Sequence, residues 1–316
     1  MILQDMAAAV SNAGGLGIIT ALTVAQPPRG AEALRDEIRK CRKLTNKPFG
    51  VNITLLPVGV PPDYEGIIKV IVEEGVKIVE TAGRNPKPVI AQLKAGGCII
   101  IHKCVAIRHA LSAARAGADM ISMDGFDCGG HPGEEDVGNW VLLAKAGAEL
   151  KKVGIPFVAS GGCATGSQLA AALALGAEGI NMGTAFMATT EAPIHANIKQ
   201  ALVDTDERGT THIFRTVNNT ERVFKNAQAM KVREIEAEFP GEFSKIYPYV
   251  KGELYRQSFQ ETGDTESSCW SCGQSIGLIT KVQSCRDLVA EIVRDADEII
   301  RGRLSSMLVG GARSRL

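Results

Sequence analysis

The most informative stretch of this sequence is MISMDGFDCGGHPGEEDVGNW, residues 120 to 140. It begins with the short apolar run Met120 to Met123, which is typical of a buried strand, and continues into Asp124, a glycine-rich loop and His131. Glycines have no side chain and can adopt positive φ angles, so the loop can lie flat against a ligand while the histidine projects beyond it. Taken alone, such a loop is equally compatible with a turn that carries a surface histidine.

Two later units repeat the arrangement of an apolar strand followed by glycine. Residues 156 to 162 read PFVASGG, and residues 179 to 184 read GINMGT. A helical pattern follows each turn, so free backbone N–H groups and the helix dipole favour an anion there. In barrels this position commonly binds phosphate, and we expect the three strand ends to meet at one site. The alternative for each turn is a tight connection without a ligand.

The apolar strands recur along most of the chain and alternate with helical patterns. They are short, rich in β-branched residues and not alternating, as expected of a parallel sheet that is covered on both faces. They are centred near residues 17, 50, 78, 99, 120, 156 and 180. We therefore predict an α/β fold, a TIM (β/α)8-type barrel whose first strand is apparently missing, because a helix precedes the first predicted strand. An open doubly wound sheet is the alternative.

A segment of different character interrupts this series. Residues 204 to 268 are more charged and less periodic, with helical spacing in 221 to 237 and three clustered tyrosines. We predict a small helical lobe on the substrate side, with residues 1 to 203 and 269 to 316 forming the barrel. We call residues 204 to 268 the added lobe.

The composition excludes several classes of protein. The 316 residues are 45% apolar and carry 35 basic and 35 acidic side chains, so no net field favours nucleic acid. The N-terminus has neither a signal-peptide pattern nor a membrane span, which predicts a cytoplasmic protein. The eight cysteines have no framework spacing, so disulfides are not expected. Cys269 and Cys272 form a CxxC, but no βαβ start precedes them and no further ligand pair is near, so no metal site is expected.

Lys103 is the other candidate for chemistry. It ends the apolar run 98 to 104, where packing would favour an aliphatic side chain. A lysine at this position should face a ligand or a carboxylate. Asp124, at the end of the next strand, could be that carboxylate, in which case the pair is structural.

Several segments together resemble one known family, the FMN-dependent nitronate monooxygenases, formerly called 2-nitropropane dioxygenases, with their NADH:quinone reductase relatives. The resemblance covers nearly the whole chain. It is carried by AAAVSNAGGLG (7 to 17), PFGVNITLLP (48 to 57), ETAG (80 to 83), IHKCVAIRHAL (101 to 111), DGFDCGGHPGEED (124 to 136), ASGGCATGSQLAAALALGAEGINMGTAF (159 to 186) and WSCGQSIGLI (270 to 279).

The resemblance implies FMN as cofactor and His131 as the catalytic residue beside its reactive face. The implied cofactor-binding residues are Thr54, Lys103, Asp124, Gly129, Gly130, Ser160, Gly161, Gly162, Gly183 and Thr184. The substrate would be a small molecule, a quinone or an alkyl nitronate, with NADH as reductant in the first case. A homodimer is compatible with the resemblance.

The loop chemistry favours the quinone reductase branch. The loop reads GGHPGEED, whereas the monooxygenases typically have GGHRG. We expect the acidic residues 134 to 136 to repel an anionic nitronate, while a neutral quinone is not repelled. The alternatives are a nitronate monooxygenase, which converts alkyl nitronates with O₂ to a carbonyl compound and nitrite, and a non-catalytic barrel without cofactor. A flavin enoyl-acyl-carrier-protein reductase is a weaker match.

Overall fold

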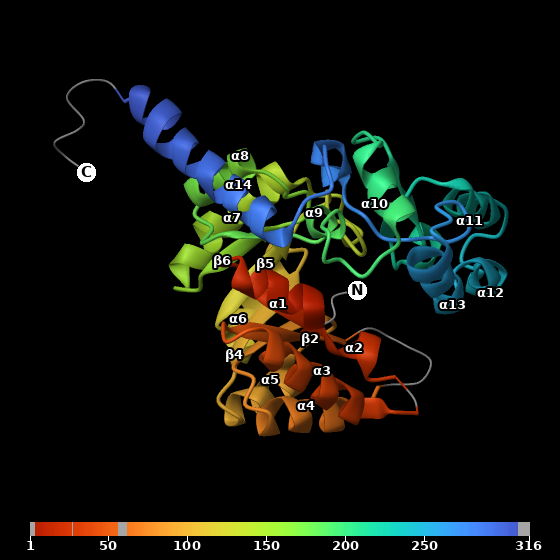
Figure 1. Cartoon of the computed structure of the whole chain (residues 1–316), viewed down its shortest axis with the longest axis horizontal. Helices are drawn as coiled ribbons and strands as arrows, with labels where there is room; N and C mark the ends of the chain where they lie inside the picture. The colour runs from red at the N-terminus through yellow and green to blue at the C-terminus, as the bar shows by residue number, and fades with distance from the viewer. Residues whose placement is uncertain (1–3, 27, 56–61, 309–316) are drawn as a thin grey trace.

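A parallel β-sheet with helices around it forms the main body of the protein (Figure 1). The computed structural model describes residues 4–26, 28–55 and 62–308. Within them the sheet has seven strands that pair in chain order, each parallel to the next. They are β1 (Gly17–Thr20), β2 (Phe49–Leu55), β3 (Ile78–Gly83), β4 (Ile99–Cys104), β5 (Met120–Asp124), β6 (Phe157–Ser160) and β7 (Ile180–Asn181). The predicted α/β class and all seven predicted strand positions are confirmed.

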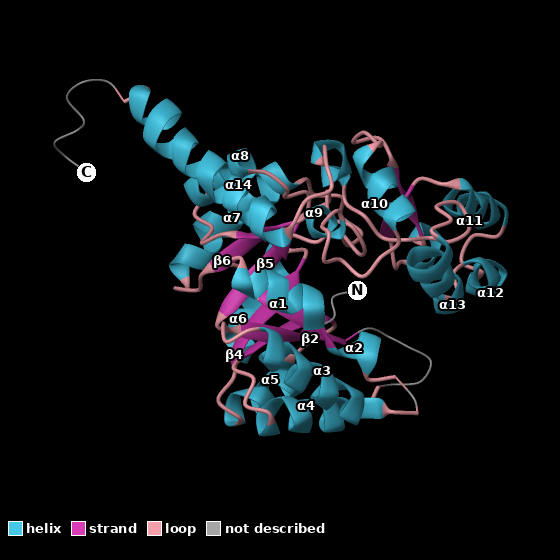
Figure 2. Ribbon diagram, in the orientation of Figure 1, coloured by secondary structure: helices cyan, strands magenta, loops and turns pink. Residues whose placement is uncertain are grey.

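Helices connect successive strands and pack against the sheet (Figure 2). Their apolar faces join the strands in one large core, in which Leu34, Ile71 and Leu93 are fully buried. Local signals set their ends: Asp63 caps α4 through the N–H of Gly66, and Gly117 ends α6 in a left-handed conformation. The helices are α1 (Gln4–Asn12), α2 (Ala21–Val24), α3 (Gly30–Leu44), α4 (Tyr64–Glu73), α5 (Lys87–Ala95), α6 (Ile107–Ala116), α7 (Asn139–Lys152), α8 (Gly166–Ala174) and α9 (Thr184–Met187).

The sheet curls so that its first and last strands approach a common interior. Asn181 on β7 donates hydrogen bonds to Glu80 on β3 (3.1 Å) and Ser122 on β5 (3.2 Å), although these strands are not neighbours in the sheet. A flat sheet would hold them too far apart. In the described part of the chain β1 and β7 do not pair with each other. The fold is thus a half-barrel of the TIM type, as the strand pattern predicted.

The added lobe contains a β-hairpin as well as helices. Strand β8 (Thr210–Ile213) pairs antiparallel with β9 (Glu221–Phe224), and α11 (Ala227–Glu238) follows. The helix predicted over residues 221 to 237 is therefore wrong for its first six residues, of which the first four form β9. Asn226 starts the helix later, because its side chain accepts the N–H of Ala229. The lobe also contains the helical turn η1 (Arg215–Val217), α12 (Phe243–Ile246), η2 (Tyr247–Tyr249), α13 (Gly252–Arg256) and η3 (Gln257–Thr262).

Aromatic packing joins the added lobe to the half-barrel. Trp270 is fully buried and stacks on Phe224 with ring centroids 4.2 Å apart, and Phe259 packs against the same indole. Helix α10 (Ala196–Val203) and the turn η4 (Gln274–Leu278) share this core. Helix α14 (Cys285–Glu298) and its continuation η5 (Ile299–Leu304) then return to the main body, where α14 packs against α1 and α8. The domain boundaries remain a prediction.

No helix of the described residues combines the length and apolar character needed to cross a membrane.

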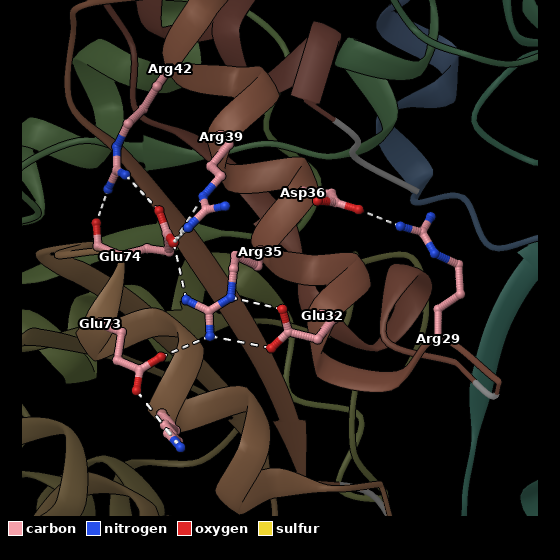
Figure 3. A network of polar contacts seen from close by, with 9 residues as sticks. Arg29, Glu32, Arg35, Asp36, Arg39, Arg42, Glu73 and Glu74 are labelled. Atoms are coloured by element: carbon pink, nitrogen blue, oxygen red, sulfur yellow. Dashed lines mark hydrogen bonds and ion pairs between the residues drawn. The ribbon is translucent and has the colours of Figure 1, made fainter.

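An ion-pair network connects α3 with the end of α4 on the outside of the sheet (Figure 3). Glu74, whose side chain is only 9% exposed, accepts hydrogen bonds from Arg35 (3.1 Å), Arg39 (3.0 Å) and Arg42 (3.0 Å). Arg35 also contacts Glu32 and Glu73. Burial alone would raise the pKa of Glu74, but the arginine hydrogen bonds outweigh it and lower that pKa.

We expect Glu74→Gln to lower the free energy of unfolding by about 1 kcal/mol, because three guanidinium groups lose one shared carboxylate. Urea denaturation measures this loss, which should shrink in about 1 M NaCl, where the Debye length falls to roughly 3 Å. The matched control is Glu298→Gln, which removes an exposed carboxylate 4.0 Å from a single arginine. A salt-independent loss, or an equal loss in the control, would contradict the electrostatic explanation.

Candidate functional site

A cavity of about 530 Å³ opens at the carboxyl ends of the parallel strands. All seven strands contribute a residue at or near that end: Thr20 from β1, Thr54 from β2, Ala82 from β3, Lys103 from β4, Asp124 from β5, Ser160 from β6 and Asn181 from β7. The segment 271 to 275 and Phe259 close it from the side of the added lobe. Because this is the edge where parallel α/β folds place their ligands, the cavity is the candidate active site.

Two glycines form a narrow turn in the wall of the cavity. Gly161 and Gly162 have φ angles of +83° and +69°, which other residues rarely adopt. A Cβ atom at Gly161 would lie 2.8 Å from Cys128 Cβ, and one at Gly162 would lie 2.8 Å from Asp127 Cβ. The turn can therefore pass this close to the 124–130 loop only with glycine at both positions.

Backbone donors lie along the same wall. The N–H groups of Gly162, Gly183 and Thr184 have no hydrogen-bond acceptor among the described residues. The acceptors of this turn are already used, because the Gly161 carbonyl accepts from the Asn139 side chain and the Gly162 carbonyl accepts from the Gln168 side chain. This end of the cavity thus offers donors rather than acceptors, as a phosphate group requires.

A hydrogen-bonded polar network fills the interior below the cavity. Glu80 accepts from Asn52 (2.8 Å) and from Asn181 (3.1 Å), and Asn52 in turn accepts from the Thr54 hydroxyl (2.9 Å). Asn181 also reaches Ser122 (3.2 Å). Four strands are tied together in this way, so the side chains at the floor of the cavity are held in fixed positions.

Lys103 lies between two carboxylates. Its ammonium nitrogen is 3.8 Å from Glu80 Oε1 and 4.0 Å from Asp124 Oδ2. Burial opposes its positive charge, but the attraction of Glu80 and then Asp124 outweighs burial and raises the pKa of Lys103. The lysine is therefore charged and supplies the positive charge at the floor of the cavity.

Asp124 keeps an unused acceptor. Its Oδ1 atom is buried and has no hydrogen-bond partner among the described residues. Burial raises the pKa of this carboxyl, and Lys103 opposes that rise. An unpaired buried oxygen costs free energy, so a donor on a bound ligand would stabilise the site.

Most of the residues predicted from the sequence line this cavity together. They are Thr54, Lys103, Asp124, Gly129, Ser160, Gly161, Gly162, Gly183 and Thr184. Gly130 and His131 do not line it. Gly130 instead pairs with the backbone of Arg222 on β9, and the exposed His131 has Nε2 3.3 Å from Asn219 Nδ2. The structure thus places His131 beside the added lobe.

The acidic residues of the loop face outward, so the expectation that they repel an anion in the site is wrong. Glu134 accepts from the N–H (2.8 Å) and hydroxyl (2.5 Å) of Thr220. Glu135 pairs with Arg108, and Asp136 pairs with Arg215 at 3.0 Å. None of the three lines the cavity. Each has a partner on a neighbouring segment, which sequence alone did not reveal.

Sequence reasoning did not assign a site role to Asn52, Glu80, Ser122 or Asn181. Their signal was present, because each is a polar residue inside a short apolar strand where an aliphatic side chain would pack better. A polar residue in a buried strand needs a partner, and these residues are one another's partners.

A parallel half-barrel whose cavity opens at the carboxyl ends of its strands, with a glycine turn in the cavity wall, is the architecture of α/β-barrel enzymes. The family model "Nitronate monooxygenase" matches residues 2–58 and 55–295. The chain belongs to the nitronate monooxygenase family, a family of flavin-dependent oxidoreductases. The resemblance noted in the sequence is thereby confirmed.

Individual relatives are similar over nearly their full length. The chain is 32% identical to (3aS,4S,5R,7aS)-5-hydroxy-7a-methyl-1-oxo-octahydro-1H-indene-4-carboxyl-CoA dehydrogenase of Rhodococcus jostii, over 92% of this chain and 88% of the relative. It is 27% identical to the nitronate monooxygenase of Paraburkholderia phytofirmans, over 93% and 89%. Among solved structures it resembles FabK from Thermotoga maritima, with a TM-score of 0.85, 34% identity, and 97% and 92% coverage.

Proposed function

We propose that this protein is an FMN-dependent NAD(P)H:quinone reductase. The observation that carries the proposal is the charge of the cavity: Lys103 is the one cation among its described lining residues, and it lies between Glu80 and Asp124. An anionic substrate would find no uncommitted cation there, whereas a neutral quinone needs none. The rest of the lining is largely apolar or hydroxyl-bearing, including Met187, Ile194 and Phe259.

FMN fits the residues that are present. The N–H groups at Gly162, Gly183 and Thr184 would hold its single phosphate, and the unpaired Asp124 Oδ1 could accept from a ribityl hydroxyl. Thr54 and Lys103 would contact the polar edge of the ring. We expect FMN rather than FAD because the cavity has one phosphate cradle. When bound, FMN accepts hydride from a reduced nicotinamide and passes electrons on to a second substrate.

The side chains around the cavity have separable roles in this reaction. The Lys103 ammonium offsets the negative charge of Glu80 and Asp124 at the floor of the cavity. Phe259, Met187 and Ile194 exclude water from the quinone. The predicted role of His131 as a hydrogen-bond donor to the substrate would require it to leave Asn219 and turn into the cavity, which it does not line.

The test is anaerobic stopped-flow mixing of the purified, yellow protein with NADH or NADPH, followed by a benzoquinone. We expect rapid bleaching of the flavin by the nucleotide and rapid recovery of colour with the quinone. Heat release and chromatography identify the flavin in the same sample. Efficient bleaching by propyl nitronate with none by either nucleotide would contradict the proposal. A folded protein without flavin colour would favour the non-catalytic alternative.

Nitronate oxidation is the second candidate, and a specific observation favours it. The acidic residues 134 to 136 have their own partners outside the cavity, so they do not repel an anion as expected from the sequence. The family model and the Paraburkholderia relative also carry this activity in their names. The propyl nitronate arm of the same experiment separates the two candidates.

A further inference from the structure

A second cavity, of about 400 Å³, lies on the added lobe. It is lined by the β8–β9 hairpin, the turn after β8 and the last turns of α11, and it is open to the surface. Three arginines line it, one from each of these segments: Arg215, Arg222 and Arg233. Glu236 is the one acidic residue among the described lining residues. The cavity thus has an excess of positive charge.

The carboxylate of Glu236 is already used by the backbone. Its Oε2 accepts the N–H of Phe214 (2.9 Å), and its Oε1 accepts the N–H (3.3 Å) and hydroxyl (3.0 Å) of Thr216. These bonds hold the turn after β8 in place. Among the described residues no ion pair joins Glu236 to an arginine of the cavity, while Arg215 is paired with Asp136 at 3.0 Å.

Two of the arginines have no carboxylate within 4.0 Å in the described residues. Arg222 is 3% exposed and donates to the Phe126 carbonyl (2.8 Å) and the Thr210 hydroxyl (3.0 Å), with its guanidinium 4.7 Å from the Phe126 ring. Arg233 donates to the Thr211 hydroxyl (3.0 Å). The nearest opposite charge acting on Arg222 is the more distant Asp127 carboxylate, and a buried cation without a close anion is costly.

His212 adds an unused donor. Its Nδ1 lies 3.1 Å from the Arg215 guanidinium, which can only donate, so Nδ1 accepts and Nε2 carries the proton. That Nε2 is buried and has no partner among the described residues. Burial, together with the charges of Arg222 and Arg215, lowers the pKa of His212 to about 4, so the ring is neutral.

We propose that this second cavity binds the 2′- or 3′-phosphate on the adenosine ribose of a nucleotide. The reactive end of the same nucleotide occupies the first cavity. The proposal rests on the proposed function, which requires a nicotinamide nucleotide. The 124–130 loop contacts both cavities: Cys128 and Gly129 line the first, while Arg222, which lines the second, bonds the backbone of Phe126 and Gly130. The 2′-phosphate of NADPH and the 3′-phosphate of a coenzyme A thioester share this chemistry.

The test is calorimetric titration of the flavin-loaded protein with adenosine 2′,5′-bisphosphate, adenosine 3′,5′-bisphosphate and AMP. We expect a bisphosphate to bind at least tenfold more tightly than AMP, and Arg233→Glu to remove that difference. Preference for the 2′ isomer identifies NADPH as the source, and preference for the 3′ isomer identifies a coenzyme A thioester. Arg233 is exposed, so the variant should fold.

The matched control is Arg208→Glu, which makes the same charge change in the added lobe at an exposed arginine outside the cavity. It should bind the bisphosphates as the native chain does. Equal affinity for AMP and both bisphosphates in the native protein, or unchanged binding in Arg233→Glu, would overturn the proposal. These titrations measure binding without turnover, so their outcome is independent of the quinone assay. Bisphosphate binding without quinone reduction would refute the reductase assignment and leave the second cavity's proposed ligand intact.

Discussion

Gly183→Asp should remove the flavin from a protein that remains folded. Gly183 has φ −117°, which other residues can adopt, and a Cβ atom there would meet nothing within 4 Å. The change therefore adds a carboxylate to the wall of the cavity without a steric clash. If the phosphate binds at Gly162, Gly183 and Thr184, each pair of like charges at ~5 Å costs about 3 kcal/mol at an effective dielectric constant of ~20. Flavin affinity should fall by roughly a hundredfold or more.

Gly183→Asn is the matched control, since it has nearly the same shape and no charge. It should retain flavin within roughly a tenfold change of affinity, because an amide can still donate to phosphate. Fluorescence titration of the apoproteins with FMN measures both affinities. Equal losses in the two variants would mean that side-chain volume, not charge, matters at this position, and retention of flavin by Gly183→Asp would place the phosphate elsewhere.

Lys103→Met should cause the largest loss of stability of any single change in the site. The variant leaves the buried carboxylates of Glu80 and Asp124 facing each other without the ammonium that lies between them. Removing one member of a buried ion pair typically costs 3–5 kcal/mol. The lysine side chain is 30% exposed to the cavity, so we expect the lower end of that range, about 3 kcal/mol. Urea denaturation measures the loss.

The pH dependence of this loss tests its cause. Burial raises the pKa of Asp124 in the folded state, and Lys103 opposes that rise. Without the lysine, the ionised carboxylate destabilises the folded chain above the raised pKa, and protonation removes this destabilisation as the pH falls. The variant should therefore regain stability relative to the native chain as the pH is lowered from neutral through that raised pKa. Lys103→Arg keeps the charge and should lose much less. A loss that does not change with pH would point to packing instead of charge.

The candidate site could be predicted from sequence only in part. Glycine turns after apolar strands fixed the positions of Gly161, Gly162 and Gly183, because each signal is local and the topology of parallel strands brings their ends together. The partners of Glu134, Glu135 and Asp136 could not be read in this way. They come from α6 and from the added lobe, and contacts between distant segments leave no local pattern.

Local sequence patterns were enough to predict the α/β class, the TIM-type barrel, the positions of its seven strands and the glycine turns. Apolar period, helix caps and obligatory glycines are properties of a few adjacent residues, so they can be read from the chain. The directions and partners of the side chains became visible only in the folded chain. His131 lies beside Asn219, and Glu80 accepts hydrogen bonds from Asn52 and Asn181. Three arginines line the second cavity on the added lobe. Those arrangements depend on how the sheet curls and where the hairpin docks, which is settled by packing between distant residues.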